Sequence, residues 1–497
     1  MNNEILYLSL VPAIAGILIF ILGRKSRALS ETLALLGTVI TFLIAVKIFG
    51  QTAVQGGVLT FWNEELRMDA LSGLIAGLVA LLGLIASVYS VPYMRREVKV
   101  GAVPAERMGV YYGWFMIFLS TMLCATTINN IILLWVIIEG TTLASIILVG
   151  FYWNRDAIEA AYKYAILLTV GITFALFGCV LLYSGASQQI AGGIDPLKLT
   201  EIAKVAGKIP KSIVLLSVVM LLVGFGTKAG MVPFHTWLPD AHAEAPTPIS
   251  AMLSGVMIKV GVYALIRTVL IFYPFYSIVS TLVLVFGMIT MVVGVIMMMM
   301  QEDLKRFLAF CSVTSMGYIL MGLGLANYLG IYGAIFHLLN HSLMKALAFL
   351  SVGAVIYSTH HRRVPELGGL GKYMPFTAVS FYAATLALGG IPFFNGFISE
   401  FTLFIAGVKA GFPWATVIAV AVAILNVAIF FHLTYQVFMG EAPENLKAAG
   451  IKEVPVMMWG GMLILAFLCL LIGVYPQIVS PILNEATKAV FATIAMP

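Results

Sequence analysis

Long apolar stretches recur along the whole chain, and short polar connections separate them. Each stretch has about 18 residues or more, so a helix formed by it can cross a hydrocarbon core of about 30 Å. About fourteen stretches are predicted as membrane spans: residues 5–22, 31–49, 69–91, 110–128, 130–150, 160–183, 212–236, 248–270, 275–300, 304–326, 329–357, 375–409, 414–439 and 456–476. The pattern therefore predicts an all-α polytopic membrane protein with about 14 transmembrane helices in one integral membrane domain, residues 1–497.

The polar connections leave no room for a separate soluble domain. The longest are 50–68, 92–109 and 184–211, and a further connection covers 440–455. The run DPLKLTEIAKVAGKIP in the third connection predicts a short surface helix, and 478–497 predicts an amphipathic helix lying on the membrane. The first stretch is followed by RKSR and not by a small-residue cleavage site, so it is interpreted as a retained span rather than a signal peptide.

Two apolar segments are interrupted by Gly and Pro beside a single ionisable group. They are VGFGTKAGMVPFHTWLPD, residues 223–240 with Lys228, and LALGGIPFFNGFISEF, residues 386–401 with Glu400. Proline removes a backbone donor, and freed backbone at membrane depth persists only where protein or a watery cavity surrounds it. Paired broken helices at matching places are typical of inverted-repeat transporters, so we expect helices 7 and 12 to be broken and repeats at about 110–270 and 275–439. The alternative is a packing kink in an ordinary bundle.

Composition and charge agree with a membrane protein. Of the 497 residues, 61% are hydrophobic and 10% are charged, whereas soluble domains have about a quarter of charged residues. The net charge is +6, and short connections after odd-numbered spans hold a group of basic residues, whereas those after even-numbered spans hold few, apart from Lys198, Lys204, Lys208 and Lys211 in one longer connection. The basic residues in the connections after odd-numbered spans are Arg24, Lys25, Arg27, Arg95, Arg96, Lys99, Arg155, Lys305, Arg306, Arg362, Arg363 and Lys372. The positive-inside rule then places these connections in the cytoplasm and both termini outside.

Neither a nucleic-acid partner nor a cysteine-bound metal is indicated by the sequence. No basic patch stands apart from the membrane flanks, so a nucleic-acid partner is not expected. The four cysteines fall inside apolar spans without CxxC spacing, which predicts neither a metal site nor a disulfide framework.

Charged residues inside spans are functional candidates, because a charge at mid-bilayer costs about 2.5–3.5 kcal/mol on insertion scales. Glu139 is centred in the fifth span, and Lys163 lies near the start of the sixth. We expect these two side chains to pair; the alternative is that Lys163 extends to the interface. Lys228 has no interface within easy reach, and Lys259 lies in the middle of the eighth span, with Arg267 nearer its end as an interface anchor.

The eleventh span reads IFHLLNHSLMKALAFL and places His337, His341 and Lys345 at i, i+4 and i+8, along one helix face. Histidine passes protons well near neutral pH, so this face is typical of a proton or hydration path. A metal pair or satisfied core histidines are the alternatives. His432 is a lone intramembrane histidine, and His235 flanks the first break, where it could simply satisfy freed backbone.

Eight of these residues form what we call the charged row, which predicts a lateral proton path across the bundle rather than a single substrate cavity. In chain order they are Glu139, Lys163, Lys228, Lys259, His337, His341, Lys345 and Glu400. The chain has no GxxxxGK[ST] motif, no GxGxxG after a strand and no cysteine cluster. No nucleotide hydrolysis, catalytic residue, metal site or cofactor is therefore expected within it, and the energy must come from an ion gradient or another subunit.

The segment GTKAGMVPFHTWLPDAHAEAPTPISAMLSGVMIKVGVY, residues 226–263, resembles the signature of the antiporter-like subunit family. That family is shared by Mrp-type sodium/proton antiporters, the proton-pumping arm of respiratory complex I, and membrane-bound hydrogenases related to formate hydrogenlyase. Supporting stretches are MDALSGL (68–74), LLWVIIEGTTLASIILVGF (133–151), EDLKRFLAFCSVTSMGY (302–318), HLLNHSLMKALAFL (337–350) and GIPFFNGFISEF (390–401).

The resemblance implies fourteen helices, two inverted five-helix repeats and broken helices seven and twelve. It implies a proton path through the eight residues of the charged row, with Asp303 and Lys305 at family positions where a structural role at a helix mouth is the expectation. Family members carry either Lys or Glu at the helix-twelve position, and this chain has Glu400. The long lateral helix of the largest members is lacking, which makes the chain similar to the D-type Mrp protein.

The expected function is therefore a proton-translocating membrane subunit of a multisubunit energy-converting complex. We favour a membrane-bound hydrogenase-like complex that couples redox chemistry in partner subunits to H⁺ or Na⁺ movement; the alternative is the D-type protein of a free-standing Mrp-type Na⁺/H⁺ antiporter. A self-sufficient small-solute transporter is the third possibility. The expected partners are other antiporter-like and small membrane subunits and a peripheral hydrogenase or redox arm, in the cell membrane. Whether the chain belongs to an enzyme depends on that complex.

Overall fold

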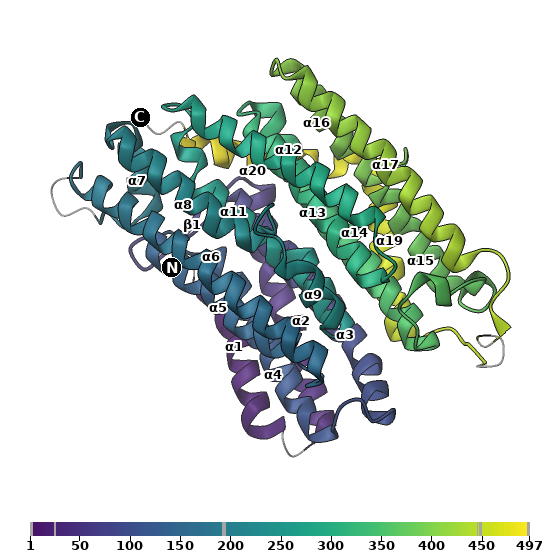
Figure 1. Ribbon diagram of the computed structural model, residues 1–497. Helices are drawn as coiled ribbons and strands as arrows, with labels where there is room; N and C mark the ends of the chain where they lie inside the picture. Colours follow the sequence, from purple (N-terminus) through teal and green to yellow (C-terminus); the bar gives the residue numbers. More distant parts are fainter. Residues whose placement is uncertain (1–2, 24–25, 191–194, 445, 447–449, 495–497) are drawn as a thin grey trace.

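The computed structural model describes residues 3–23, 26–190, 195–444, 446 and 450–494, and long helices dominate it (Figure 1). The helices are α1 (Glu4–Leu22), α2 (Arg27–Phe49), α3 (Ala70–Lys99), α4 (Met108–Ala125), α5 (Ile131–Val149), α6 (Arg155–Ser187), α7 (Leu199–Val205), α8 (Lys211–Ala229), α9 (Trp237–Glu244), α10 (Thr247–Met252), α11 (Ile258–Thr268), α12 (Ser277–Met299), α13 (Leu304–Gly324), α14 (Tyr328–Thr359), α15 (Pro375–Leu388), α16 (Asn395–Lys409), α17 (Pro413–Phe438), α19 (Val456–Val474) and α20 (Ser480–Ile494).

The predicted all-α polytopic architecture is confirmed. Within the described residues, 13 helical segments are long and apolar enough to cross a membrane. The segment Thr247–Phe272, which contains α10 and α11, is one of them, and a π-helical turn at Leu253–Met257 interrupts its regular hydrogen bonding. The predicted span 375–409 is split into α15 and α16, and the shorter of the two parts, Pro375–Leu388, is an apolar helix too short to cross alone. Together with this broken pair, α15 and α16, the 13 segments account for the predicted number of about fourteen spans.

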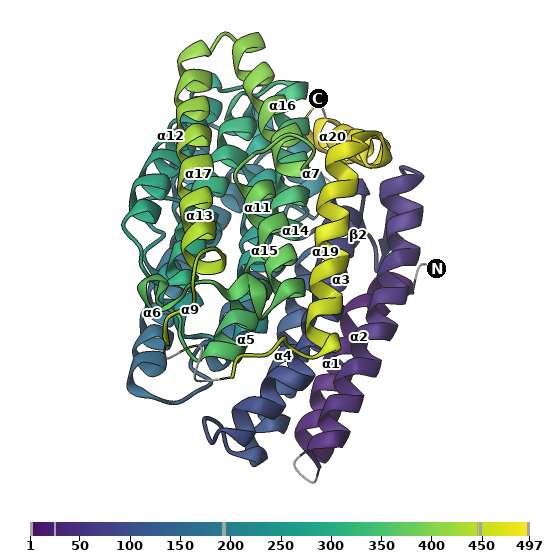
Figure 2. The same ribbon diagram turned by 90° about the vertical axis from the view of Figure 1, so that its right-hand side faces the viewer.

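The most buried helices lie at the middle of the bundle. The segments Thr247–Phe272 and Leu304–Gly324 are buried along their whole apolar length, whereas α1 and α17 expose most of theirs. Figure 2 shows α1 and α2 at one edge of the bundle and α12 and α17 at the other.

The two broken helices occupy matching places along the chain. A first series of five, α4, α5, α6, α8–α9 and α10–α11, is followed by a second series of five, α12, α13, α14, α15–α16 and α17, and the broken helix is the fourth member of each. The repeat bounds 110–270 and 275–439 stay a prediction.

The first break separates α8 from α9. Gly230 caps α8 with φ +79°, a left-handed conformation that glycine adopts without a steric penalty. Two side chains satisfy the backbone groups that the break frees: Trp237 Nε1 donates to the Thr227 carbonyl at 2.9 Å, and the Val232 amide donates to Thr290 Oγ1 at 3.1 Å. Because Thr290 belongs to α12, the first break is held in part by the second half of the bundle.

The second break separates α15 from α16. Gly390 and Phe393 have φ of +67° and +75°, so the chain turns sharply between the two half-helices. Asn340 of α14 donates from Nδ2 to the Asn395 carbonyl at 2.8 Å, and Asn395 Nδ2 donates to Asn340 Oδ1 at 3.1 Å. This reciprocal amide pair ties the start of α16 to the helix that carries the two candidate histidines.

Replacing Gly396 by valine is expected to destabilise the second break. A Cβ atom added at Gly396 would lie 1.9 Å from the Ala387 carbonyl oxygen, so α15 and α16 would have to move apart. Overpacking of this kind costs about 1–3 kcal/mol, and we expect a lower temperature of thermal unfolding in detergent. The matched control is Gly460→Val in α19, where an added Cβ meets nothing within 4 Å. Equal unfolding temperatures for the two variants would contradict this explanation.

The connections contain one element that the sequence pattern did not predict. Strands β1 (Leu59–Phe61) and β2 (Leu66–Met68) form an antiparallel hairpin between α2 and α3, with Thr60 opposite Arg67. The predicted surface helix is α7, and the predicted terminal helix is α20, which contacts α3, α7 and α14. Arg24 and Lys25, two of the basic residues that indicated the orientation, lie outside the described residues.

Candidate functional site

Lys228 lies in the last turn of α8, fully buried, immediately before the first break. Its Nζ donates to Thr142 Oγ1 of α5 at 2.9 Å, and Glu139 lies one turn earlier on the same helix. The Glu139 carboxylate acts electrostatically on the Lys228 amine. Gly261 of α11 allows a close approach here, because an added Cβ would meet the Ala229 amide nitrogen at 2.8 Å.

The expected pairing of Glu139 with Lys163 is wrong. Glu139 Oε1 accepts a hydrogen bond from Thr169 Oγ1 at 2.9 Å, and Lys163 instead forms ion pairs with Glu159 at 2.8 Å and Asp240 at 3.4 Å. The reason is depth along α6: Thr169 is six residues beyond Lys163, a rise of about 9 Å at 1.5 Å per residue. The Lys163 side chain is 50% exposed, so it lies at the margin of the bundle and not within the buried part of the charged row.

The second half places three candidates on one buried face of α14, as the i, i+4, i+8 spacing predicts. The rings of His337 and His341 stack with centroids 6.1 Å apart, and His337 Nδ1 is 3.0 Å from Ser399 Oγ of α16. Lys345 Nζ donates to the Leu308 carbonyl of α13 at 2.8 Å. Within the described part of the chain, both ring nitrogens of His341 lack a hydrogen-bond partner, so this imidazole is free to take or give a proton through water.

Hydrogen-bonding groups of the two halves meet around Ser254 and Ser312, and we call this set of groups the seam. Lys259 Nζ donates to the Ser254 carbonyl, and Ser254 Oγ lies 2.8 Å from Ser312 Oγ of α13. Ser312 Oγ also bonds to the Leu308 carbonyl at 3.0 Å, the same oxygen that accepts from Lys345 at 2.8 Å. Lys259 of the first half and Lys345 of the second each donate to a backbone carbonyl, and the seam therefore brings the two amines to either side of a pair of hydroxyl groups, which can both donate and accept.

The far end of the charged row is Glu400 of α16, which is buried. It lies against the second break: a Cβ added at Gly390 would meet Glu400 Oε2 at 2.4 Å. His432 does not join this group, because it is exposed on α17. His235 lies buried in the first break, edge-on to Phe310 of α13 at 6.1 Å.

Asp303 and Lys305 begin α13 and hold the neighbouring segments together. Asp303 Oδ1 accepts from the amides of Lys305 and Arg306 at 2.9 and 3.0 Å, which caps the helix. Arg362 forms ion pairs with Asp303 at 2.8 Å and with Glu244 of α9 at 3.0 Å. Lys305 itself is buried, and its Nζ donates to backbone carbonyls at the end of α9.

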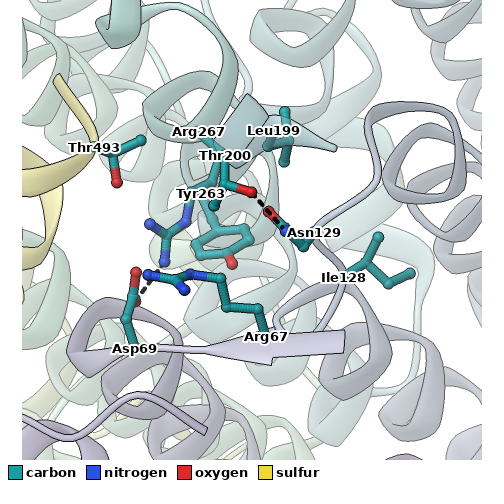
Figure 3. A pocket seen from close by; sticks show the side chains of 9 residues that line it. All are labelled: Arg67, Asp69, Ile128, Asn129, Leu199, Thr200, Tyr263, Arg267 and Thr493. Atoms are coloured by element: carbon teal, nitrogen blue, oxygen red, sulfur yellow. Dashed lines mark hydrogen bonds and ion pairs between the residues drawn. The ribbon is translucent and has the colours of Figure 1, made fainter. Parts of the chain in front are cut away.

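Arg267 is not the interface anchor that its position suggested. It is buried, and its Nη2 lies 2.5 Å from Asp69 Oδ1 and 3.1 Å from Ser72 Oγ, while its guanidinium covers the Tyr263 ring at 4.9 Å. Figure 3 shows the guanidinium groups of Arg67 and Arg267 both directed toward the Asp69 carboxylate. This cluster joins the hairpin and α3 to the end of α11.

The buried amines are the main electrostatic feature of the site. Lys228, Lys259 and Lys345 are at most 1% exposed. Among the described residues, Lys259 and Lys345 form no ion pair, and each donates to a backbone carbonyl. An isolated ammonium is costly to bury, and buried lysines exchange protons more readily than lysines in water. The arrangement can therefore hold and pass protons, and it offers no metal-ligand cluster within the described chain.

The residues that sequence reasoning missed are the hydroxyl groups between the charges. Thr142 accepts from Lys228, and Ser254 and Ser312 lie between Lys259 and Lys345, but serine and threonine are frequent in any span and carry no signal by themselves. In the structure, Ser254 lies in the π-helical turn Leu253–Met257, and such turns often occur at functional sites.

Comparisons with known proteins concern the chain as a whole. Residues 128–426 match the family described as NADH:quinone oxidoreductase/Mrp antiporter, TM. Hydrogenase-4 component B of Escherichia coli (strain K12) is 32% identical and covers 88% of this chain and 70% of its own length. NADH-quinone oxidoreductase subunit N of Desulforudis audaxviator (strain MP104C) is 32% identical and covers 86% of this chain and 85% of its own length.

A solved structure shares the fold over the full length. A chain of the membrane-bound sulfane sulfur reductase, an archaeal respiratory membrane complex, superposes with a TM-score of 0.88 at 24% sequence identity. The match covers 100% of this chain and 98% of that one. That neighbour is part of a complex, and at this identity the likeness concerns the fold.

Proposed function

Because this chain belongs to the NADH:quinone oxidoreductase/Mrp antiporter family, we propose that it is a proton-translocating membrane subunit of a multisubunit energy-converting complex. The observation that carries the proposal is the seam, which joins buried amines of both halves without a carboxylate partner for either among the described residues. Buried amines beside a pair of hydroxyl groups suit the passage of protons rather than the binding of a solute.

The proposed path uses the buried members of the charged row. Protons move between Lys228 and Lys259 in the first half, with Glu139 tuning the charge of Lys228. They cross the seam to Lys345 and continue along His341 and His337 toward Glu400. Lys163 lies outside this path and forms ion pairs at its margin.

We favour a membrane-bound hydrogenase-like complex that couples redox chemistry in partner subunits to H⁺ or Na⁺ movement. The name of the relative Hydrogenase-4 component B supports this preference. The alternative is the D-type protein of a free-standing Mrp-type Na⁺/H⁺ antiporter. The description of the family supports this alternative as well, because it names Mrp antiporters. The proposed partners are other antiporter-like and small membrane subunits, with a peripheral hydrogenase or redox arm in the first case.

We further propose that the chain lies in the cell membrane with both termini outside. The positive-inside distribution of Lys and Arg supports this orientation. Arg362 and Arg306 lie at one end of the bundle, where they pair with Asp240 and Glu244 of α9 and with Asp303, which caps α13. This end is therefore assigned to the cytoplasm.

The test is to purify the chain from its native membrane in mild detergent with whatever remains bound, and to identify the bound proteins by mass spectrometry. Nickel–iron or iron–sulfur subunits would support the hydrogenase-like complex. Small membrane subunits and other antiporter-like chains alone would support the Mrp alternative. A chain that is purified alone and still transports ions would contradict the proposal.

A further inference from the structure

One buried face of α11 leads from the seam to the outer end of the bundle, opposite to the end assigned to the cytoplasm. Lys259, Tyr263 and Arg267 share this face, because they are spaced i, i+4 and i+8 on the helix, and all three are buried. At 1.5 Å per residue, Arg267 lies about 12 Å beyond Lys259. Thr493 of α20 lines the same pocket as Arg267, and Figure 1 and Figure 2 show α20 and α9 toward opposite ends of the bundle.

Two hydroxyl groups cover the middle of this face. The Tyr263 hydroxyl lies 2.9 Å from Ser72 Oγ of α3 and 3.2 Å from the Thr126 carbonyl oxygen. Ser72 Oγ in turn accepts a hydrogen bond from Arg267 Nη2 at 3.1 Å. Because hydroxyl groups donate and accept, Tyr263 and Ser72 by themselves would let a proton move outward beyond Lys259.

Beyond the hydroxyl groups, the face is closed by what we call the outer cluster: Arg267, Asp69 and Arg67. Arg267 Nη2 contacts Asp69 Oδ1 at 2.5 Å, and its guanidinium covers the Tyr263 ring at 4.9 Å. Figure 3 shows the Arg67 guanidinium directed toward the same carboxylate, so two cations share one anion. A guanidinium remains charged at physiological pH and has no acceptor atom, so neither arginine can relay a proton.

We propose that the outer cluster is a fixed-charge barrier, which stops protons on Lys259 from leaving the first half at the outer end. The barrier rests on the proposed function and adds to it a reason why these protons cross the seam to Lys345. Fixed arginines exclude protons from polar pores by their charge. One net positive charge about 10 Å away disfavours a second one by about tenfold or more at an effective dielectric constant of about 20.

Removing the charges while keeping the site polar is expected to open a proton leak. The variant Arg267→Gln with Asp69→Asn replaces the buried ion pair by two neutral amides, which still donate and accept. The complete complex is reconstituted in liposomes without its driving substrate, a potassium diffusion potential draws protons inward, and an enclosed dye reports the pH. The leak should be about tenfold or more faster than in the wild type. Leakage of chloride into the same vesicles should not change, whereas a merely disrupted fold would let both ions through.

Arg67→Gln is the second variant, and it keeps the buried ion pair. It removes the positive charge that Asp69 does not neutralise, so it should also speed up the proton leak. If the first variant does not assemble, Arg67→Gln decides the question, since this side chain is partly exposed in the hairpin. The matched control is Arg363→Gln with Glu302→Gln, which removes an exposed ion pair and should leave the leak unchanged. A leak at the wild-type rate in both variants of the outer cluster would overturn the barrier.

Lys259→Met connects the leak to the proposed path. Added to Arg267→Gln with Asp69→Asn, it should return the leak to the wild-type rate, because protons no longer reach the outer cluster. A leak that persists would overturn the barrier, since the protons would then bypass Lys259. Driven proton movement in Lys259→Met alone tests the proposed function separately. A wild-type rate there would overturn that function and the barrier with it, whereas a slow rate without a leak in the outer-cluster variants would overturn the barrier alone.

Discussion

Replacing Lys345 by methionine will lower proton movement through the complete complex by about a hundredfold or more, because a proton-transfer group of this kind contributes about 10²–10⁴-fold. Methionine preserves the length and apolar stem of the side chain but carries no proton. The Leu308 carbonyl keeps its bond from Ser312, so the backbone around the seam stays satisfied. The measurement is dye-reported proton movement in membrane vesicles that contain the complex.

The control for this variant is Lys488→Met on α20. Lys488 is 64% exposed and pairs with Glu485, three residues away. The control removes the same charge from the same chain without touching a buried group, and proton movement should stay at the wild-type rate. A Lys345→Met complex that moves protons as fast as the Lys488→Met complex would refute a role for Lys345 in the path.

Replacing Arg267 by methionine is expected to destabilise the protein by about 3–5 kcal/mol, the cost of removing one partner of a buried ion pair. The side chains of Arg267 and Asp69 are only 10% and 7% exposed, and their contact is 2.5 Å long. The variant leaves a buried carboxylate without its main countercharge. Thermal unfolding in detergent measures the loss.

The stabilities of the wild type and of Arg267→Met should also depend differently on pH. Burial alone would raise the pKa of Asp69, but the Arg267 guanidinium outweighs burial and holds that pKa below its usual value. In the wild type the stabilisation by ionised Asp69 is present at neutral pH and is lost only below about pH 4. Without Arg267, burial dominates and raises the pKa, so the folded variant binds a proton more readily than the unfolded chain. Its stability should therefore increase as the pH is lowered from about 8 to about 5.

Two further variants sharpen this test. The double variant Asp69→Leu with Arg267→Met removes both charges, and it should recover most of the lost stability. Arg363→Met breaks the exposed pair with Glu302, in which both side chains are at least 59% exposed, and it should cost about 1 kcal/mol or less. An Arg267→Met variant that is no less stable than Arg363→Met would show that the buried pair does not support the fold.

Much of the fold could be predicted from the sequence because hydrophobic length and helix breakers are local signals. The spans, the breaks after Lys228 and before Glu400, and the shared face of His337, His341 and Lys345 all follow from spacing along one helix. The hairpin Leu59–Phe61 with Leu66–Met68 was missed, since two three-residue strands give too short an alternation to stand out.

Pairing between helices could not be predicted in the same way. The partners of Glu139 and Arg267 depend on relative depth and rotation of packed helices, which no local pattern encodes, and both expectations were wrong for that reason. His432 was a lone candidate in the sequence, and only its exposed position on α17 separates it from the buried histidines. Ser254 and Ser312 are ordinary residues until two helices bring them together at 2.8 Å.

The central claim is that the seam joins both halves into one proton path. The most direct measurement compares proton movement by the reconstituted complex for Lys259→Met, Lys345→Met and the double variant. One continuous path predicts that each single variant loses nearly all movement and that the double variant is no slower than either. Two independent half-channels would instead leave about half of the rate in each single variant and abolish it only in the double variant. That second result would contradict the central claim.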